Sequence, residues 1–494
     1  MRVVRPFALL ALCSTLVPDR ALAYDLAVEV ETVGQGYQIA AADGSLIDRR
    51  RLQQYLGLSL WNFGPKDALG APMAKNQWSF TMSLRLNADF GNFTVDQIGL
   101  RNVRDELGPR PLDLLFAYAT ARDLAGFIDL KLGRQVQVDQ FEFLSFDGAT
   151  IDVKTPYWFG VEAWGGLKVT GALPFDSPLY RADGTSPSAI STHDTDWKPT
   201  VGAALHSFGV RDLDARLSYR RTFSPAQNST PAELATGATD GTSEEKLAWS
   251  LRGRLLRGRL LPWLGLRYNL LLGALDQVQA GARWQLSDRH ALQAEYLYSY
   301  PTFDGDSIWN LFVRHQFDDV RAGYDLRLGA VALYARGFVR LFHETVALPT
   351  ETPPAGSLSY GGTVGGRLGM RRGFVRADAY LDTGYGGQRI GFDAATRMQL
   401  RDWIGLEGRL TYVHFEDDLR PIDHGDSLGA QLGARVEWRG LLLHLIAEDN
   451  INRYYNSQFR LYAVIDFGRF AGTRGVTIAP ARGVGATAGQ WGGF

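Results

Sequence analysis

The chain has 494 residues, with 52 Lys and Arg against 53 Asp and Glu, and a formal net charge of -1 at pH 7. This balance provides no global field for a polyanion, so we expect no nucleic-acid partner. No segment after the N-terminal region approaches the ~18 consecutive apolar residues of a spanning helix. No Pro/Ser-rich linker divides the chain, so a single large domain is expected.

The N-terminal region has the pattern of a secretory signal peptide. Arg2 and Arg5 precede an apolar run over 7–17, and Ala21-Leu22-Ala23 provides small residues for cleavage. We therefore predict a signal peptide over 1–23. Cys13, the single cysteine, would leave with it, so the mature chain would contain neither a disulfide nor a thiolate.

From residue 77 the dominant pattern is strict alternation. QWSFTMSLRLNADF (77–90) places apolar residues at every second position, which is typical of a strand with one apolar and one polar face. The same pattern recurs at 213–220, 246–252, 277–286, 390–400 and 428–438. These segments run about 10 to 16 residues, against roughly 5–6 for an ordinary strand.

Short and long turn signals alternate between these segments. Short ones include 287–290 and 371–373, and long polar ones include 174–196 and 225–241. This is the layout of an outer-membrane barrel. So many apolar strand faces need lipid to cover them, and a sheet can cross hydrocarbon only as a closed barrel. A soluble β-helix or propeller is the alternative, but its regular repeats are absent.

The predicted fold class is all-β: a single transmembrane antiparallel up-and-down β-barrel over 24–470 with about 22 strands (range 18–24). Both termini would be periplasmic, a plug domain is not expected, and the lumen would be open or narrowed by a folded-in loop. We treat 320–342 as one strand with a β-bulge at Ala330-Val331, and 471–494 as a Gly/Ala-rich C-terminal tail. The predicted strands lie near 25–39, 51–63, 76–91, 111–122, 126–135, 145–155, 157–172, 196–208, 210–224, 242–257, 258–272, 276–286, 290–300, 307–317, 320–342, 357–371, 374–385, 389–400, 403–415, 425–438, 441–450 and 456–470.

The polar faces of these strands would line the lumen, and they are rich in arginine. Because guanidinium pairs with carboxylate, phosphate or sulfate in two-pronged fashion, such a lining favours an anionic solute or polymer. Alternatively, these arginines pair with acids on neighbouring strands and hold the wall together. The candidate lumen-lining, anion-binding residues are Arg216, Arg220, Arg252, Arg254, Arg267, Arg283, Arg327, Arg367, Arg397 and Arg435.

One local motif has a family resemblance. LKLGRQ (130–135), a Phe-rich segment and then SFDGATIDV (145–153) resemble the "GRQ … FDG" strand pair of alginate-export-type outer-membrane porins. The matching positions are Arg134, Gln135, Asp147 and Gly148. The resemblance implies a monomeric channel for an anionic exopolysaccharide. A hairpin held by pairing of Arg134 with Asp147 is the alternative interpretation.

Catalytic signals are weak. GDSLG (425–429) matches the nucleophile-elbow pattern, but that motif needs a strand–turn–helix context, and Ser427 begins an alternating strand. We predict no catalytic residue, metal or cofactor. The expected function is a channel for polar, anionic solutes or a secreted polysaccharide; the alternative is a structural barrel in an adhesion, motility or export complex. Expected partners are outer-membrane lipid and lipopolysaccharide, the barrel-assembly machinery and, for an exporter, periplasmic export components.

Overall fold

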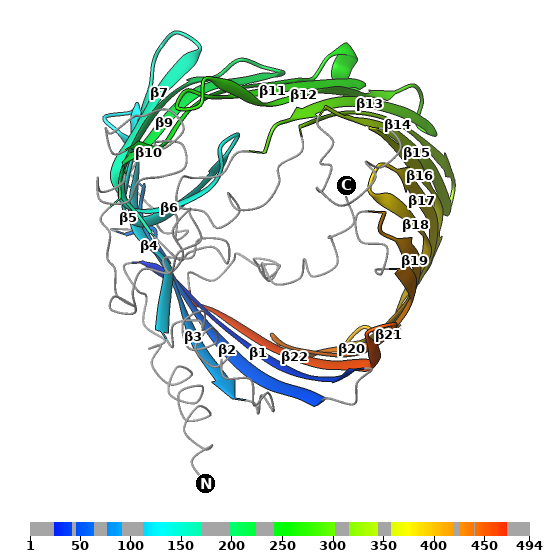
Figure 1. The fold of residues 1–494 in the computed structure, drawn as a ribbon. Coiled ribbons are helices and arrows are strands. Elements are labelled where there is room, and N and C mark those ends of the chain that lie inside the picture. Colours follow the sequence, from blue (N-terminus) through cyan, green and yellow to red (C-terminus); the bar gives the residue numbers. More distant parts are fainter. Residues whose placement is uncertain are drawn as a thin grey trace, which may run out of the picture.

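A computed structural model describes residues 24–41, 46–63, 77–90, 112–169, 198–223, 242–301, 316–343, 357–418, 424–438 and 440–471. These residues form a closed ring of antiparallel strands (Figure 1). Each strand pairs with the next in the chain, and β1 pairs with β22 over almost its whole length, from Leu26↔Ala471 to Ala41↔Tyr455. The predicted 22-strand antiparallel barrel is therefore confirmed.

The strands and one 3-10 turn have the following bounds: β1 (Asp25–Ala41), β2 (Leu46–Trp61), β3 (Gln77–Phe90), β4 (Leu112–Leu124), β5 (Ile128–Asp139), β6 (Glu142–Lys154), β7 (Phe159–Lys168), β8 (Pro199–Ser207), β9 (Leu213–Phe223), β10 (Thr242–Gly253), η1 (Leu256–Gly258), β11 (Leu260–Asn269), β12 (Ala274–Gln285), β13 (His290–Ser299), β14 (Phe317–Leu328), β15 (Val331–Phe342), β16 (Leu358–Met370), β17 (Gly373–Gly384), β18 (Gly387–Arg401), β19 (Ile404–Glu416), β20 (His424–Trp438), β21 (Leu441–Asn452) and β22 (Tyr455–Ala471). No helix in the described ranges is both long and apolar enough to cross a membrane.

The strand total of 22 is correct, but one of the predicted strands is wrong. The segment 320–342 is not one bulged strand: it turns at Gly329-Ala330, where Gly329 has a φ of +63°, and forms β14 and β15. The predicted strand 307–317 lies outside the described residues except at its last two positions, and β13 pairs directly with β14. The division of 320–342 adds one strand, and no strand of the wall lies between β13 and β14, so the total stays at 22. The predicted signal peptide 1–23 and the tail after Ala471 also lie outside the described residues.

The lengths of the connections between strands differ between the two ends of the barrel. At one end of the barrel, nine of the ten connections contain two to six residues, and the tenth spans 62–76. The other end carries the long connections, such as 224–241 and 343–357. The connection from β13 to β14 lies at this end, and the turn at 329–330 lies at the opposite end. The connection from β15 to β16 is therefore again at the end with the long connections. We call the two ends the short-turn end and the long-loop end.

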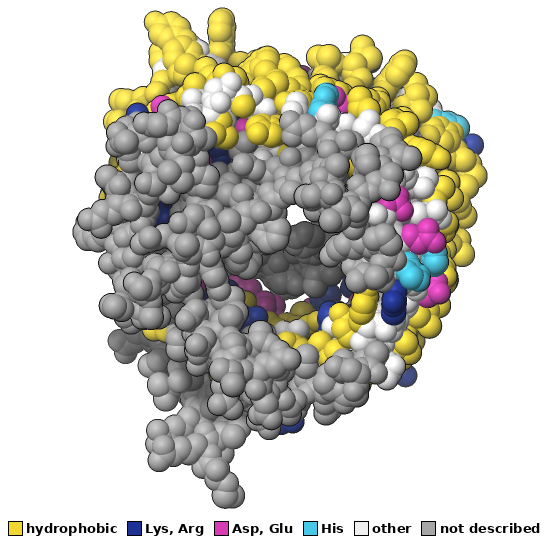
Figure 2. Space-filling view, viewed as in Figure 1, with side chains coloured by type: hydrophobic (Ala, Val, Ile, Leu, Met, Phe, Trp, Pro, Cys, Tyr) yellow, Lys and Arg dark blue, Asp and Glu magenta, His cyan; other side chains and the backbone are white. Residues whose placement is uncertain are grey.

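The outer face of the wall is apolar. Alternate residues of each strand point outward, and Figure 2 shows hydrophobic side chains around the outside of the ring, with charged side chains along the opening. Many of these outward residues are highly exposed: Leu432 at 73%, Val364 at 61% and Val320 at 57%. A continuous apolar surface of this extent is expected to be covered by hydrocarbon.

Substitution of Leu432 by Arg should therefore destabilise the folded barrel by about 2–4 kcal/mol, because Leu432 lies in the middle of β20 on the outward face. Urea titration of the protein folded into phospholipid vesicles measures this difference. The control is Gln431→Arg, one residue away on the inward face, where Glu448 lies opposite. Equal effects of the two substitutions would contradict the assignment of the faces.

Candidate functional site

The hairpin formed by β5 and β6 leaves the wall and enters the lumen. Pairing of β5 with β4 stops at Arg134↔Ala117, and pairing of β6 with β7 stops at Phe146↔Lys168. Beyond these points β5 and β6 pair only with each other, to Asp139↔Glu142. Figure 1 shows this ribbon inside the ring. We call residues 135–146 the inward hairpin; it corresponds to the folded-in element expected from the sequence.

Glycines allow the hairpin to bend at its base. Gly133 has a φ of +120°, a backbone conformation that residues other than glycine rarely adopt. A Cβ at Gly133 would overlap the carbonyl oxygen of Ala117, and one at Gly148 would overlap that of Gly165. The backbones therefore approach more closely here than a residue with a side chain would permit.

The inward hairpin has its own apolar core inside the barrel. Leu144 and Phe146, at 2% and 0% exposed, pack with Trp164 of β7 and Ala204 of β8. A Cβ at Gly202 would overlap the Trp164 ring, so glycine at 202 lets that ring lie flat over β8. Burial of about 1.5–3 kcal/mol per large apolar side chain holds the hairpin against this part of the wall.

The tip of the hairpin reaches β9, which lies three strands further round the wall than β6. The Arg220 guanidinium donates to the carbonyl oxygen of Phe141 at 3.1 Å and lies 5.0 Å from the centroid of that ring. Arg220 also pairs with Glu244 at 2.5 Å, and Lys246 pairs with the same carboxylate at 3.1 Å. All three charged side chains are nearly fully buried, at 5%, 1% and 7% exposed. The tip is thus tied to a buried ionic cluster.

The residues of the "GRQ … FDG" segment lie at the base of this hairpin. Arg134 donates from Nε and a terminal nitrogen to both oxygens of Asp147, each at 2.7 Å, and from its other terminal nitrogen to the Leu114 carbonyl. Gln135, 2% exposed, donates to the Gly148 carbonyl and accepts from the Thr150 hydroxyl. The arrangement agrees with the interpretation of a hairpin held by Arg134 and Asp147.

Acids shared between two bases line the inner wall of β12–β19. Asp325 pairs with Arg283 at 3.1 Å and with Arg336 at 2.5 Å. Asp319, which is 0% exposed, pairs with Arg321 at 2.9 Å and with Arg340 at 2.7 Å. Each carboxylate thus binds two guanidinium groups from different positions on the wall and neutralises one of their two charges.

The pattern continues through β17–β21. Asp393 pairs with Arg376 at 2.9 Å and with Arg409 at 2.5 Å. Glu407 contacts Arg397 at 2.9 Å and His444 at 2.7 Å. We call this series of shared acids, Asp319, Asp325, Asp393 and Glu407, together with their basic partners, the ionic ladder.

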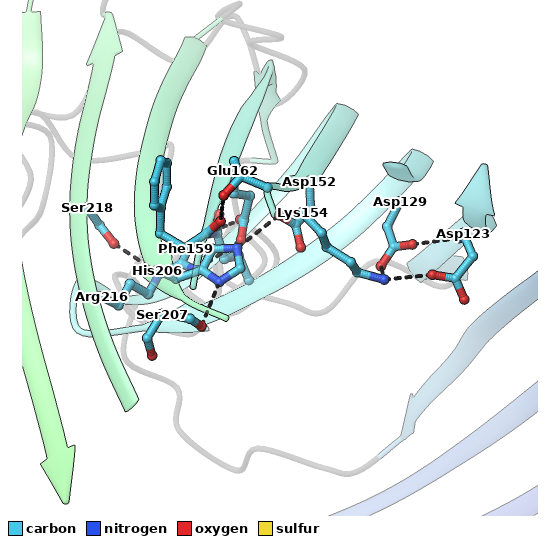
Figure 3. Close-up of polar contacts among 12 residues, drawn as sticks. Asp123, Asp129, Asp152, Lys154, Phe159, Glu162, His206, Ser207, Arg216 and Ser218 are labelled. Carbon is cyan, nitrogen blue, oxygen red and sulfur yellow. Dashed lines mark hydrogen bonds and ion pairs between the residues drawn. The ribbon is translucent and has the colours of Figure 1, made fainter. Parts of the chain in front are cut away.

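A further polar group lies on the inner face of β5–β9 (Figure 3). Arg216 of β9 pairs with Glu162 of β7 at 2.9 Å, and His206 of β8 contacts Asp152 of β6 at 2.9 Å. Lys154 lies between Asp123 and Asp129, at 2.9 Å from each. Cross-strand pairing, rather than free positive charge, is the rule here as well.

The ten predicted lumen arginines divide into two groups. Six have acidic partners: Arg216, Arg220, Arg267 (Asp276, 3.3 Å), Arg283, Arg397 and Arg435 (Glu437, 3.4 Å). In the second group, the Arg367 guanidinium lies 4.2 Å from the centroid of the Phe374 ring. Arg252 and Arg327 form no side-chain ion pair within the described ranges, and Arg254 lies beyond the end of β10, in the turn.

This pairing favours wall-holding ladders over a lining of free guanidinium groups, because the predicted arginines are mostly compensated. The sequence alone does not indicate which arginines share an acid, since the partners come from separate strands. It also left out Phe141 and Trp164, which seat the hairpin. The signal for Phe141 was the Phe-rich run between two glycine-containing motifs, and Trp164 lies outside that run.

Replacing Asp393 with Asn should shift the ion selectivity toward anions, because it removes the acid between Arg376 and Arg409 while keeping a similar shape. The reversal potential in a salt gradient across a planar bilayer measures this shift. Asp426→Asn is the matched control: it removes the same charge from the outward face of β20, at the long-loop end. A reversal potential that moves equally in both variants would contradict the lumen assignment.

The weak catalytic motif has no catalytic context. Ser427 lies within β20, which continues to Trp438 as a strand, so the strand–turn–helix geometry of a nucleophile elbow is not formed. Among the described residues, no cluster of three or more His, Cys, Asp or Glu side chains could hold a metal ion.

Comparisons with known proteins found neither a matching family model nor a matching curated protein. The resemblance to alginate-export-type porins therefore has no support beyond the residues that suggested it. Solved structures with a similar outline include the following two. A BenF-like porin from Pseudomonas fluorescens Pf-5 is 10% identical, with a TM-score of 0.44, covering 91% of this chain and 100% of that one. OccAB4 from Acinetobacter baumannii is 9% identical, with a TM-score of 0.42, covering 92% and 100%. Similarity at this level identifies neither a family nor a function.

Proposed function

We propose that the protein is an outer-membrane channel for small polar solutes, with its lumen narrowed by the inward hairpin. One observation carries this proposal: the closed barrel has an apolar outer face and a charged inner face, and the inward hairpin folds across part of the interior. Barrels of this size need a plug or loop to narrow an otherwise wide lumen. The short-turn end, with both chain ends of the barrel, would face the periplasm.

The charge pattern supports polar solutes of either sign rather than a polyanion. In the ionic ladder each shared carboxylate neutralises one of its two bases, but it engages donors of both, so few guanidinium donors of the ladder are left for a solute. Strong binding of a polysaccharide carboxylate needs guanidinium groups with free donors. We therefore infer a weakly selective pathway, and favour small solutes over the polymer that the sequence motif implied.

Reconstitution of the purified protein into planar bilayers tests the proposal. We expect discrete single-channel steps with modest ion selectivity, recorded with KCl on both sides and then in a gradient. Absence of conductance from a correctly folded barrel would overturn the proposal and favour the alternative, a non-conducting structural barrel. A steep preference for anions would overturn the inference of charge compensation while leaving the channel itself intact.

A further inference from the structure

The outer face of the described wall has a hollow near the short-turn end. A groove of about 400 Å³ is lined mainly by Trp158, Phe159, Leu205, Ala215, Leu217 and Trp249, with His206, Ser207 and Arg216 beside them. Leu205, Leu217 and Trp249 are register partners on three neighbouring strands, β8, β9 and β10. Ala215 is small, so the space between the surrounding large side chains stays open. The lining of the groove is mainly apolar, which suits the acyl chain of a lipid.

Two neighbouring turns at the same end of these strands are strongly basic. The β8–β9 turn (208–212) carries Arg211, whose side chain is 95% exposed. The β10–β11 turn (254–259, sequence RLLRGR) carries three more arginines. The Arg254 N–H donates to the carbonyl oxygen of Asp212 at 2.9 Å, so the two turns are joined. Asp212 is the one acid in these eleven residues, which leaves a clear excess of positive charge.

The β10–β11 turn also exposes apolar side chains. Leu255 and Leu256 are 50% and 62% exposed, and they lie between arginines. Leu256 and Arg257 have φ values of +52° and +59°, in the left-handed region that residues with side chains rarely occupy. Exposed leucines flanked by arginines are typical of a segment at a membrane interface, where the leucines enter the acyl region and the arginines contact phosphates.

We propose that these features form a binding site for an anionic glycerophospholipid of the leaflet at the short-turn end. An acyl chain would occupy the groove, and the headgroup phosphate would contact Arg211, Arg257 and Arg259. Apolar lining and basic turns lie at one end of the same strands, which is the charge and shape complementarity that such a lipid requires. This inference rests on the proposed membrane location, but not on conduction through the lumen.

Native mass spectrometry of the delipidated protein in detergent tests the site, with dioleoyl phosphatidylglycerol and dioleoyl phosphatidylcholine as probes at equal concentrations. We expect the anionic lipid to bind at least tenfold more tightly, given roughly fivefold per nearby arginine. The variant R211Q/R257Q/R259Q should lose this preference. The matched control R289Q/R371Q/R372Q removes three arginines from other turns at the same end and should keep it.

A second variant, Ala215→Trp, fills the groove and should weaken binding of both lipids without removing any charge. Equal binding of the two lipids by the parent protein, or an equal loss of preference in the control, would overturn the proposal. Because the groove lies on the outer face, conductance should be the same in all of these variants. Retained lipid preference in a protein that does not conduct would count against the proposed channel and leave the lipid site standing.

Discussion

Replacing residues 136–144 with a short Gly-Ser link should raise the single-channel conductance, by roughly twofold or more, because the lumen of a barrel this wide is narrowed only by what folds into it. The inward hairpin reaches from its base at Arg134 and Asp147 to Arg220 on β9. Its removal leaves the pairing of β4 with β5 and of β6 with β7 intact. Planar-bilayer recording measures the change directly.

Two point variants test whether packing of the inward hairpin against the wall, rather than its presence alone, keeps the conductance steady. Trp164→Ala removes the surface on which Leu144 and Phe146 pack, so we expect rapid fluctuation between parent-like and larger conductance levels. Val138→Ala changes a hairpin side chain that is 74% exposed and makes no contribution to the seat, so stable parent-like steps are expected. A folded deletion variant with the parent conductance would show that the hairpin does not narrow the pathway.

Replacing Glu244 with Gln should destabilise the barrel by about 3–5 kcal/mol, because it leaves Arg220 and Lys246 buried without their shared counter-charge. The loss would appear as a lower midpoint urea concentration for unfolding of the protein in vesicles. It would also appear on gels, as a lower heating temperature at which the band of the compact, folded protein is lost. The tip of the inward hairpin should loosen in the same variant, since Arg220 also holds Phe141.

The comparison variant is Arg397→Gln, which breaks a ladder pair whose arginine is 54% exposed. Exposed pairs contribute about 0–1 kcal/mol, so this change should be small. The triple variant R220M/E244L/K246M replaces all three charges with apolar groups and should recover much of the lost stability. Equal stability of the Glu244→Gln and Arg397→Gln variants would contradict the buried cluster as the stronger anchor.

The alternation of residue types was sufficient to predict the strands of the wall. For β3, β9, β18 and β20 the apolar phase read from the sequence is the face that lies outward. Alternation is a local property that is set by the pleat of each strand, so it can be recognised without knowing which strands pair. It failed at Gly329-Ala330, where a two-residue turn resembles a bulge because both shift the phase by a small step.

The lumen was less predictable, because its arrangement depends on contacts between distant parts of the chain. Nothing near Arg134 in the sequence shows that β5 leaves the wall after Gly133, since the bend requires the backbones of β4 and β7 to be close. Similarly, Arg283 and Arg336 share Asp325 only because β12, β14 and β15 are brought together by the sheet. Counting arginines therefore overestimated the free positive charge.

The most direct measurement of the two-faced wall is a cysteine-accessibility scan along β20. Because Cys13 is the only cysteine in the chain, single substitutions from Ser427 to Val436 in a Cys13→Ser background each provide one thiol for a membrane-impermeant, water-soluble reagent. We expect rapid labelling at 427, 429, 431, 433 and 435 and protection at 428, 430, 432, 434 and 436, in protein folded into vesicles. Uniform labelling, or uniform protection, along the strand would contradict a wall with lipid on one side and water on the other.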